Sequence, residues 1–151
     1  MKKDSRLSSI LHVLLHMAHS DRSMTSEELA TFLQTHPVVV RRTMSGLREL
    51  GYVRATKGHG GGWMLCANWQ TVTLRDIYDA VGCPPVFALG HRLEEPQCLV
   101  EQAVNEALDD AFREAEALLI GRLAHVTLAD LAADFSRRCR QRPQRRIAHG
   151  H

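Results

Sequence analysis

The chain has 151 residues, of which 44% are hydrophobic and 24% are charged, and its formal net charge is +2. This length allows one domain with a sizeable core, or a small domain with a helical appendage, and the composition excludes collagen-like, low-complexity and disordered chains. No apolar run approaches the roughly 20 residues that a membrane-spanning helix needs. The N-terminal segment lacks the features of a secretory signal. We therefore expect a cytoplasmic protein with no membrane partner.

Charge is distributed unevenly along the chain. Residues 1–75 hold 10 Lys and Arg against 5 Asp and Glu, residues 76–135 hold 3 against 12, and residues 136–151 hold 6 against none. A basic half attracts polyanions and an acidic half repels them, although chance clustering of solvated charges is the alternative. The four cysteines are widely spaced without a CxxC pair, which argues against a zinc ribbon.

Apolar residues at helical spacing predict a first helix from about residue 5 to residue 19. His12, His16 and His19 share a different face of this helix. Histidines one turn apart can bind zinc. Because no carboxylate or thiol accompanies them, we favour a solvated face and predict no metal site.

A short second helix is expected to begin after Thr25. Thr25 and Glu28 have the spacing of a capping box, in which the threonine side chain and the glutamate three residues later satisfy each other's backbone N–H groups. The helix should run to about Leu33, with Leu29, Phe32 and Leu33 pointing inward.

The third helix is expected to begin at Pro37, whose fixed φ suits a first helical position, and to end at Gly51. Val40, Met44 and Leu47 form its expected buried face. Two helices joined by a tight turn are typical of a helix-turn-helix, although an ordinary helical hairpin has the same pattern. The residues expected to contact DNA from this turn and helix are His36, Val38, Val39, Arg41, Arg42 and Ser45.

Residues 52–56 and 62–66 predict two strands of a β-hairpin, joined by a glycine-rich loop. The loop lacks the ending of a nucleotide-binding P-loop. We interpret it as a wing whose tip, formed by Lys57, Gly58 and His59, reaches DNA. A flexible surface hairpin is the alternative. Cys66, on the return strand, is expected in the core.

The second half is expected to be helical. Thr73 begins a short helix that ends near residue 82, a long loop follows, a long helix spans about residues 97–123, and Thr127 begins a last helix through about Cys139. One small domain can hardly cover the long helix, so we expect it to form a homodimer, although packing on its own domain is the alternative. The apolar residues expected in the dimer contact are Val100, Val104, Leu108, Ala111, Ala115, Leu118 and Leu119.

Several motifs resemble the BadM/Rrf family of bacterial transcriptional regulators. They are residues 47–53 (LRELGYV), the wing at 57–63 (KGHGGGW) and residues 127–131 (TLADL). Residues 37–42 (PVVVRR) and 95–98 (EPQC) are most similar to the YwnA-like branch of that family. The resemblance implies a winged-helix homodimer that binds a palindromic operator in double-stranded DNA and usually represses. It places Arg41 and Arg42 on the recognition helix and Lys57 at the position of the wing arginine.

The chain departs from the family's cluster-binding members, which carry three cysteines in the loop and at the start of the long helix. Only Cys98 matches, and Cys83 lies 15 residues upstream. We therefore predict no cofactor. A metal- or iron–sulfur-dependent regulator remains the alternative, because side chains could substitute for the missing thiolates. The candidate substitutes are His91, Glu94, Glu95 and Glu101.

Cys98 is expected near the amino terminus of the long helix, where the helix dipole favours a thiolate. Such a cysteine is susceptible to oxidation. The hypothesis is a one-cysteine redox sensor, and an unreactive, partly buried cysteine is the alternative.

Together these patterns predict a mainly α fold with a small β-hairpin. Residues 1–72 form a winged helix-turn-helix domain, residues 73–136 a dimerisation and sensor region, and residues 137–151 a basic, disordered tail. No catalytic constellation is visible, so we predict a DNA-binding regulator and not an enzyme. A winged-helix protein-interaction adaptor without DNA activity is the alternative of another class.

Overall fold

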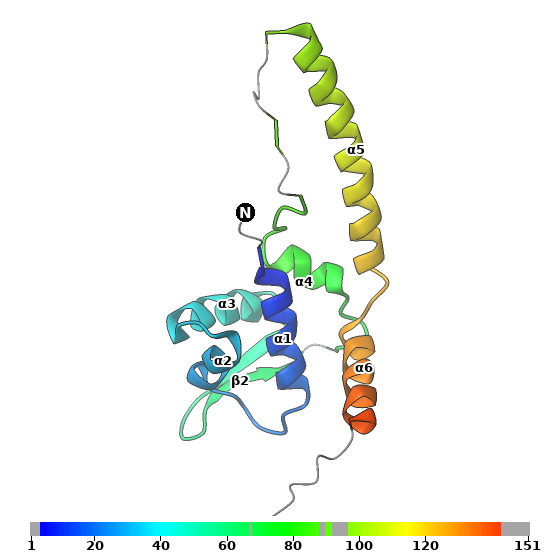
Figure 1. Cartoon of the computed structure of the whole chain (residues 1–151). Coiled ribbons are helices and arrows are strands. Elements are labelled where there is room, and N and C mark those ends of the chain that lie inside the picture. Colours follow the sequence, from blue (N-terminus) through cyan, green and yellow to red (C-terminus); the bar gives the residue numbers. More distant parts are fainter. Residues whose placement is uncertain (1–3, 67, 88–89, 92–96, 143–151) are drawn as a thin grey trace, which may run out of the picture.

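The computed structural model describes residues 4–66, 68–87, 90–91 and 97–142. These residues form six helices and one two-stranded sheet (Figure 1). No helix within the described residues is both long and apolar enough to cross a membrane. The elements in chain order are α1 (Arg6–Ala18), α2 (Ser26–Leu33), α3 (Pro37–Glu49), β1 (Val53–Thr56), β2 (Gly62–Leu65), α4 (Leu74–Ala80), α5 (Leu99–Leu123) and α6 (Leu128–Gln141).

The first two helices follow the predicted pattern. α1 buries one stripe that includes Val13 and Leu14. At the start of α2, the Thr25 hydroxyl accepts a hydrogen bond from the Glu28 N–H at 3.1 Å, and the Glu28 carboxylate accepts one from the Thr25 N–H at 2.8 Å. This capping box confirms the predicted start of α2.

α3 begins and ends as its sequence predicts. His36 is the N-cap, and its Nδ1 accepts a hydrogen bond from the Val38 N–H at 3.2 Å. Val40, Met44 and Leu47 are buried against the core. After the last turn, Gly51 has a φ of +82°, the left-handed conformation that favours glycine at a helix end.

The wing is an antiparallel hairpin that is bound to the segment before α2. β1 pairs with β2, with Ala55 opposite Trp63. Trp63 also exchanges backbone hydrogen bonds with Met24 (2.8 and 3.0 Å), and its buried Nε1 donates to the Ser26 hydroxyl at 3.0 Å. A Cβ on Gly62 would lie 2.4 Å from the Met24 carbonyl oxygen, so this close approach requires glycine.

α4 and α6 are capped in the same way and lie next to each other at their starts. Thr73 and Thr127 both form capping boxes, and these two residues form an isolated antiparallel bridge. The Leu74 N–H donates to Val126 O at 2.8 Å, and the Leu128 N–H donates to Val72 O at 2.9 Å. These contacts hold the start of α6 against the winged domain, whereas α5 projects beyond the body (Figure 1).

Two side chains that were expected in the core lie at the surface. Phe32 is 39% exposed, although Leu29 on the same helix is buried. Cys66 is exposed, and its thiol donates to the Gly51 carbonyl oxygen. Both predictions are wrong: Phe32 lies off the buried stripe of α2, where its ring stacks on His16, and Cys66 follows the end of β2.

The histidine face of α1 is not simply solvated. The Nε2 atoms of His12 and His16 lie 2.9 Å apart, and the His16 ring stacks on Phe32 with ring centroids 4.1 Å apart. His19 makes an edge contact with Phe135 of α6. Burial is the main cause that lowers the pKa of His16, followed by the charges of His12 and His19.

The C-terminal basic segment is partly helical. α6 continues to Gln141, so the first residues of the predicted tail at 137–151 belong to a helix and not to a disordered segment. The remainder of that predicted tail, from residue 143, lies outside the described residues. Much of the predicted loop between α4 and α5 also lies outside them.

Candidate nucleic-acid interface

α3 presents its predicted contact residues on the side opposite the core. Val38 and Val39 are each 49% exposed, and Arg41 and Arg42 are also exposed. Ser45 is half-buried. Because Val40, Met44 and Leu47 fix the opposite side of the helix in the core, these outer side chains are available to a partner.

The two arginines of α3 have different surroundings. Arg41 Nη2 lies 2.7 Å from Glu27 Oε1, in an exposed ion pair that joins α3 to α2. Arg42 has no hydrogen-bond or ion-pair partner for its side chain among the described residues. The sequence placed both arginines on the recognition helix, but it gave no signal that Glu27 would hold one of them.

The wing tip is exposed and carries two basic groups. Lys57, Gly58 and His59 are exposed, as predicted. Gly58 and Gly60 have φ of +91° and +75°, which the tight turn requires. The turn is closed by a hydrogen bond from the Gly61 N–H to the Gly58 carbonyl oxygen at 2.9 Å.

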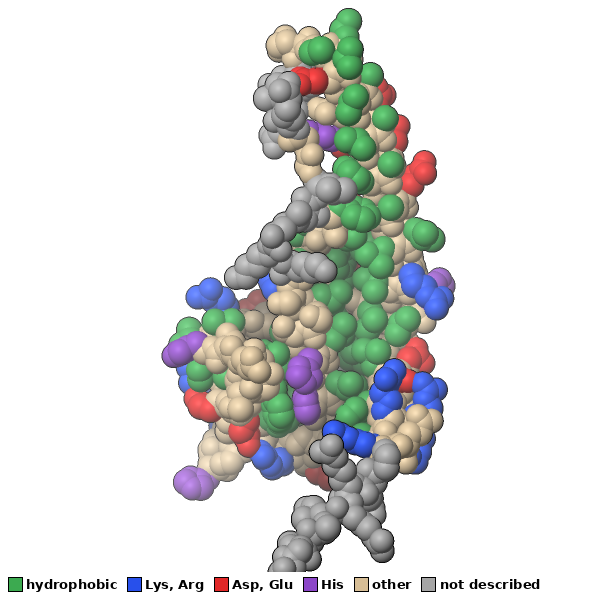
Figure 2. All heavy atoms as spheres, in the orientation of Figure 1, with side chains coloured by type: hydrophobic (Ala, Val, Ile, Leu, Met, Phe, Trp, Pro, Cys, Tyr) green, Lys and Arg blue, Asp and Glu red, His purple; other side chains and the backbone are tan. Residues whose placement is uncertain are grey.

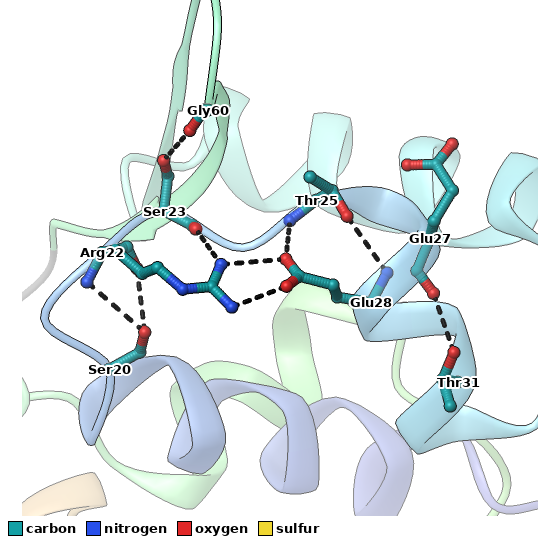
Figure 3. A network of polar contacts seen from close by, with 8 residues as sticks. All are labelled: Ser20, Arg22, Ser23, Thr25, Glu27, Glu28, Thr31 and Gly60. Carbon is teal, nitrogen blue, oxygen red and sulfur yellow. Dashed lines mark hydrogen bonds and ion pairs between the residues drawn. The ribbon is translucent and has the colours of Figure 1, made fainter.

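A polar network that the sequence did not indicate fixes the tip to the start of α2 (Figure 3). The Ser23 hydroxyl donates to the Gly60 carbonyl oxygen at 2.7 Å. Arg22 donates to the Ser23 carbonyl oxygen at 3.0 Å and to both carboxylate oxygens of Glu28 at 2.6 and 3.1 Å. Ser23 therefore joins the wing tip to the segment before α2, and in that segment Arg22 pairs with Glu28, the residue that caps α2.

This network lowers the pKa of Glu28. The hydrogen bonds from Arg22 are the largest cause, the backbone N–H of Thr25 is the next, and together they lower the pKa from 4.5 to about 2. The carboxylate is thus charged throughout the neutral range, and the bidentate geometry with Arg22 is maintained.

α3 and the hairpin lie toward the same side of the molecule, whereas α5 and α6 lie on the opposite side (Figure 1). An exposed helix with basic side chains has the width to enter a major groove, and a basic hairpin tip can contact phosphates or the minor groove. The arrangement therefore has the chemistry of a double-stranded DNA contact.

α5 presents a continuous apolar surface. No residue of this 25-residue helix is buried. Val100 is 70% exposed and Leu118 is 78% exposed, and Figure 2 shows hydrophobic side chains along the helix. The remaining predicted contact residues on α5, all exposed, are Val104, Leu108, Ala111, Ala115 and Leu119.

Cys98 lies where the sequence predicted, at the N-cap of α5, and it is exposed. The backbone N–H groups of Glu101 and Val100, in that order, lower the pKa of its thiol. Burial and a hydrogen bond to Asp79 raise the pKa of the Cys83 thiol instead. The two cysteines of this region therefore differ in their tendency to form a thiolate.

The described residues contain no group of three or more histidine, cysteine, aspartate or glutamate side chains that could hold a metal ion. His91, one of the considered substitutes, has its Nε2 2.7 Å from Asp109 Oδ1. Two others, Glu94 and Glu95, lie outside the described residues. The donors that the structure does describe therefore do not fit a metal ion or an iron–sulfur cluster.

Known proteins with similar sequence and structure are transcriptional regulators. YwnA of Bacillus subtilis (strain 168), named as an HTH-type transcriptional regulator, is 29% identical over 128 residues, which cover 85% of this chain and 95% of YwnA. A crystal structure named as that of a transcriptional regulator from Lactobacillus plantarum is 29% identical, with a TM-score of 0.71 over 87% of this chain and 90% of that one. The IscR of T. potens, at 15% identity, shares the fold with a TM-score of 0.63, over 89% of this chain and 88% of that one.

A family model also matches most of the chain. Residues 4–134 match the Rrf2 family, whose description is "Iron-dependent Transcriptional regulator". Among the described residues there is no donor set that fits iron. The helix-turn-helix, the wing and the long helix agree with this assignment. The chain belongs to the Rrf2 family of helix-turn-helix transcriptional regulators.

Proposed function

We propose that two copies of the chain bind a palindromic operator, with one α3 and one wing on each half-site, and that the bound dimer represses transcription. The observation that carries this proposal is the outer side of α3, where Arg41, Arg42 and two exposed valines stand opposite a buried core stripe. Repression would follow because an occupied operator excludes the transcription machinery from the same DNA.

In this proposal some side chains contact bases and give sequence specificity, whereas others contact phosphates and position the protein on DNA. Arg41 or Arg42 reads a guanine edge, because an arginine fork matches the two acceptors of guanine in the major groove. Val38 and Val39 offer apolar contact to thymine methyl groups. Lys57 neutralises a phosphate or enters the minor groove. The other expected contacts are His36, Ser45, Gly58 and His59.

The second copy would pack along α5. Seven apolar residues on this helix lie within an arc of about 100°, counting 100° per residue. At 1.5 Å per residue the helix is about 37 Å long, and such a surface left in water would be an aggregation liability. A two-fold dimer covers the same surface on both copies and presents two recognition helices, which suits a palindromic site.

A thiol switch at Cys98 is the signal that we propose for this regulator. Its thiol is exposed and its pKa is lowered by two backbone N–H groups at the start of α5. With hydrogen peroxide as oxidant, the thiolate sulfur attacks one peroxide oxygen, the O–O bond breaks, and a sulfenic acid and hydroxide form. This change at the first turn of the dimer helix would alter how the two DNA-binding halves are held.

A salt titration separates this function from that of a protein-interaction adaptor. Affinity for a duplex should fall steeply with salt, because each neutralised phosphate releases counterions. Replacing both Arg41 and Arg42 by glutamine should weaken binding and reduce the slope. Arg75→Gln on α4 is the matched control and should behave as the parent. A parent protein that binds no duplex at low salt would leave the adaptor as the function.

A further inference from the structure

A cavity of about 770 Å³ opens on the flank of the recognition helix. Its walls come from four separate segments: the start of α1, the turn between α2 and α3, the flank of α3 and the end of α4. The volume falls within the range of about 300–1,000 Å³ that is typical of small-molecule sites.

Apolar and polar side chains both line the cavity. Ile10 and Leu47, both buried, line it together with Val81 of the α4 end. Hydroxyl groups in the lining come from residues such as Ser9 and Thr35. Apolar walls with a few placed polar groups are the usual composition of a ligand site.

The charge of the lining has one sign. Arg6 and Arg42 line the cavity, and no aspartate or glutamate is among the lining residues. Arg6 is already engaged, since its Nη2 lies 2.8 Å from Asp4 Oδ2 and its Nη1 donates to the Val81 carbonyl oxygen at 3.4 Å. Arg42, the other lining arginine, has no side-chain hydrogen-bond or ion-pair partner among the described residues, so it is available to a negative group.

The cavity also touches two elements on which regulation would depend. Val39, Arg42, Thr43 and Gly46 form one flank of α3 and line it. On the other side, residues 80–82 end α4 and lead into the segment that continues to α5. A molecule in the cavity would contact the recognition helix and the exit toward the proposed dimer helix at once.

We propose that this cavity binds a small organic anion, with one carboxylate or phosphate group on an apolar body, and that the anion is held by Arg42. Its apolar body would pack against the lining residues Ile10, Leu47 and Val81. Because Arg42 is also a proposed DNA contact, the bound anion competes with the operator for this side chain. The effect on DNA rests on the proposed function, whereas binding of the anion does not.

The test uses three aromatic probes of the same shape: naphthalene-2-carboxylate, 2-naphthyl phosphate and the neutral naphthalene-2-carboxamide. Dissociation constants are measured with the full chain in the absence of DNA. We expect at least one anionic probe to bind at least tenfold more tightly than the amide, because only the anions can pair with the guanidinium. The two anions distinguish a carboxylate site from a phosphate site.

Two variants locate the binding. A Cβ at Gly46 has nothing within 4 Å, so the side chain of Gly46→Phe should fill the cavity. This variant should bind all three probes at least tenfold more weakly. The Arg42 side chain is exposed and does not hold the fold. Arg42→Gln should therefore bind the anionic probes about tenfold more weakly and bind the amide with unchanged affinity. Arg75→Gln, an exposed arginine outside the cavity, should leave every constant at the parent value.

Loss of the anion preference in Arg42→Gln, with the amide unaffected, supports the site. No probe binding to the parent, equal affinity for anion and amide, or full binding by a folded Gly46→Phe protein overturns it. Since these measurements contain no DNA, a chain that binds the probes but no duplex retains the anion site and loses only the proposed function.

Discussion

Arg41 of the recognition helix forms an ion pair with Glu27 of the preceding helix, with 2.7 Å between Nη2 and Oε1. Both side chains are more than half exposed. The pair therefore adds little to stability, in general about 0–1 kcal/mol for such exposed pairs. Its main consequence is that the Glu27 carboxylate occupies the guanidinium of Arg41, a side chain that is proposed to contact DNA.

Glu27→Gln should increase DNA affinity severalfold while changing the melting temperature little. The substitution releases Arg41 and removes a negative charge beside the proposed phosphate path. Binding curves at two salt concentrations check this, together with a thermal melt. Glu49→Gln, at the far end of α3, is the control and should change affinity less. Equal or weaker binding by Glu27→Gln would show that Arg41 needs the ion pair to hold its binding position.

Lys57→Ala should weaken duplex binding and lower the salt slope by about one unit, because one phosphate contact is lost. Affinity measured over a series of salt concentrations gives the slope. Arg54→Ala, on β1 away from the tip, is the control, and its salt slope should remain closer to that of the parent. An unchanged slope in Lys57→Ala would remove the wing tip from the DNA contact.

The parts of the fold that depend on local chemistry could be predicted from the sequence. Thr25, Thr73 and Thr127 each begin a helix where the capping-box spacing indicates. Two short strand segments joined by a glycine-rich loop predicted the wing, and the apolar stripe predicted the buried side of α3. These signals are carried by residues within about one helical turn of each other.

The features that the sequence did not predict depend on contacts between distant segments. Phe32 was expected inward, but it stacks on His16, a residue 16 positions earlier on another helix. The hydrogen bond from Ser23 to Gly60 crosses 37 residues. No sequence spacing indicates such contacts, because they arise only after the helices and the hairpin have packed.

Placing a charge on the apolar face of α5 should dissociate the proposed dimer. Val104→Glu would place a carboxylate in an interface that offers it no partner, and we expect dimerisation to weaken at least about 100-fold. Analytical ultracentrifugation measures the change. Arg113→Glu adds the same side chain on the opposite side of α5, outside the apolar arc, and this variant should remain dimeric. If Val104→Glu assembles as the parent does, α5 is covered in another way.

Cys98→Ser should make DNA binding insensitive to hydrogen peroxide. In the parent, mild oxidant should convert the exposed Cys98 thiolate to a sulfenic acid and reduce operator affinity. Cys83→Ser should respond to oxidant as the parent does, because burial and Asp79 raise the pKa of the Cys83 thiol. The switch fails as an explanation if Cys98→Ser loses DNA in oxidant to the same extent as the parent.

Acid should destabilise the winged domain in part through Glu28. Its pKa is about 2 in the folded chain against an ordinary 4.5, so between these values the unfolded chain binds more protons. The free energy of unfolding should therefore fall as the pH decreases from 4.5 toward 2. Chemical denaturation across this range should show a shallower pH dependence for Glu28→Gln than for the parent. A parallel dependence in both proteins would show that the Arg22–Glu28 pair is not maintained in solution.

Selection of bound duplexes from a random DNA pool tests the central claim most directly. The reduced protein should enrich a two-fold-symmetric site, with half-sites about 10–11 base pairs apart or a multiple of that spacing. An Arg41→Gln or Arg42→Gln protein should relax the preference at single positions within each half-site, at a cost of about 1–3 kcal/mol where the arginine contacts a base. Enrichment of no sequence by the reduced parent protein, under conditions in which it remains folded, would contradict the account.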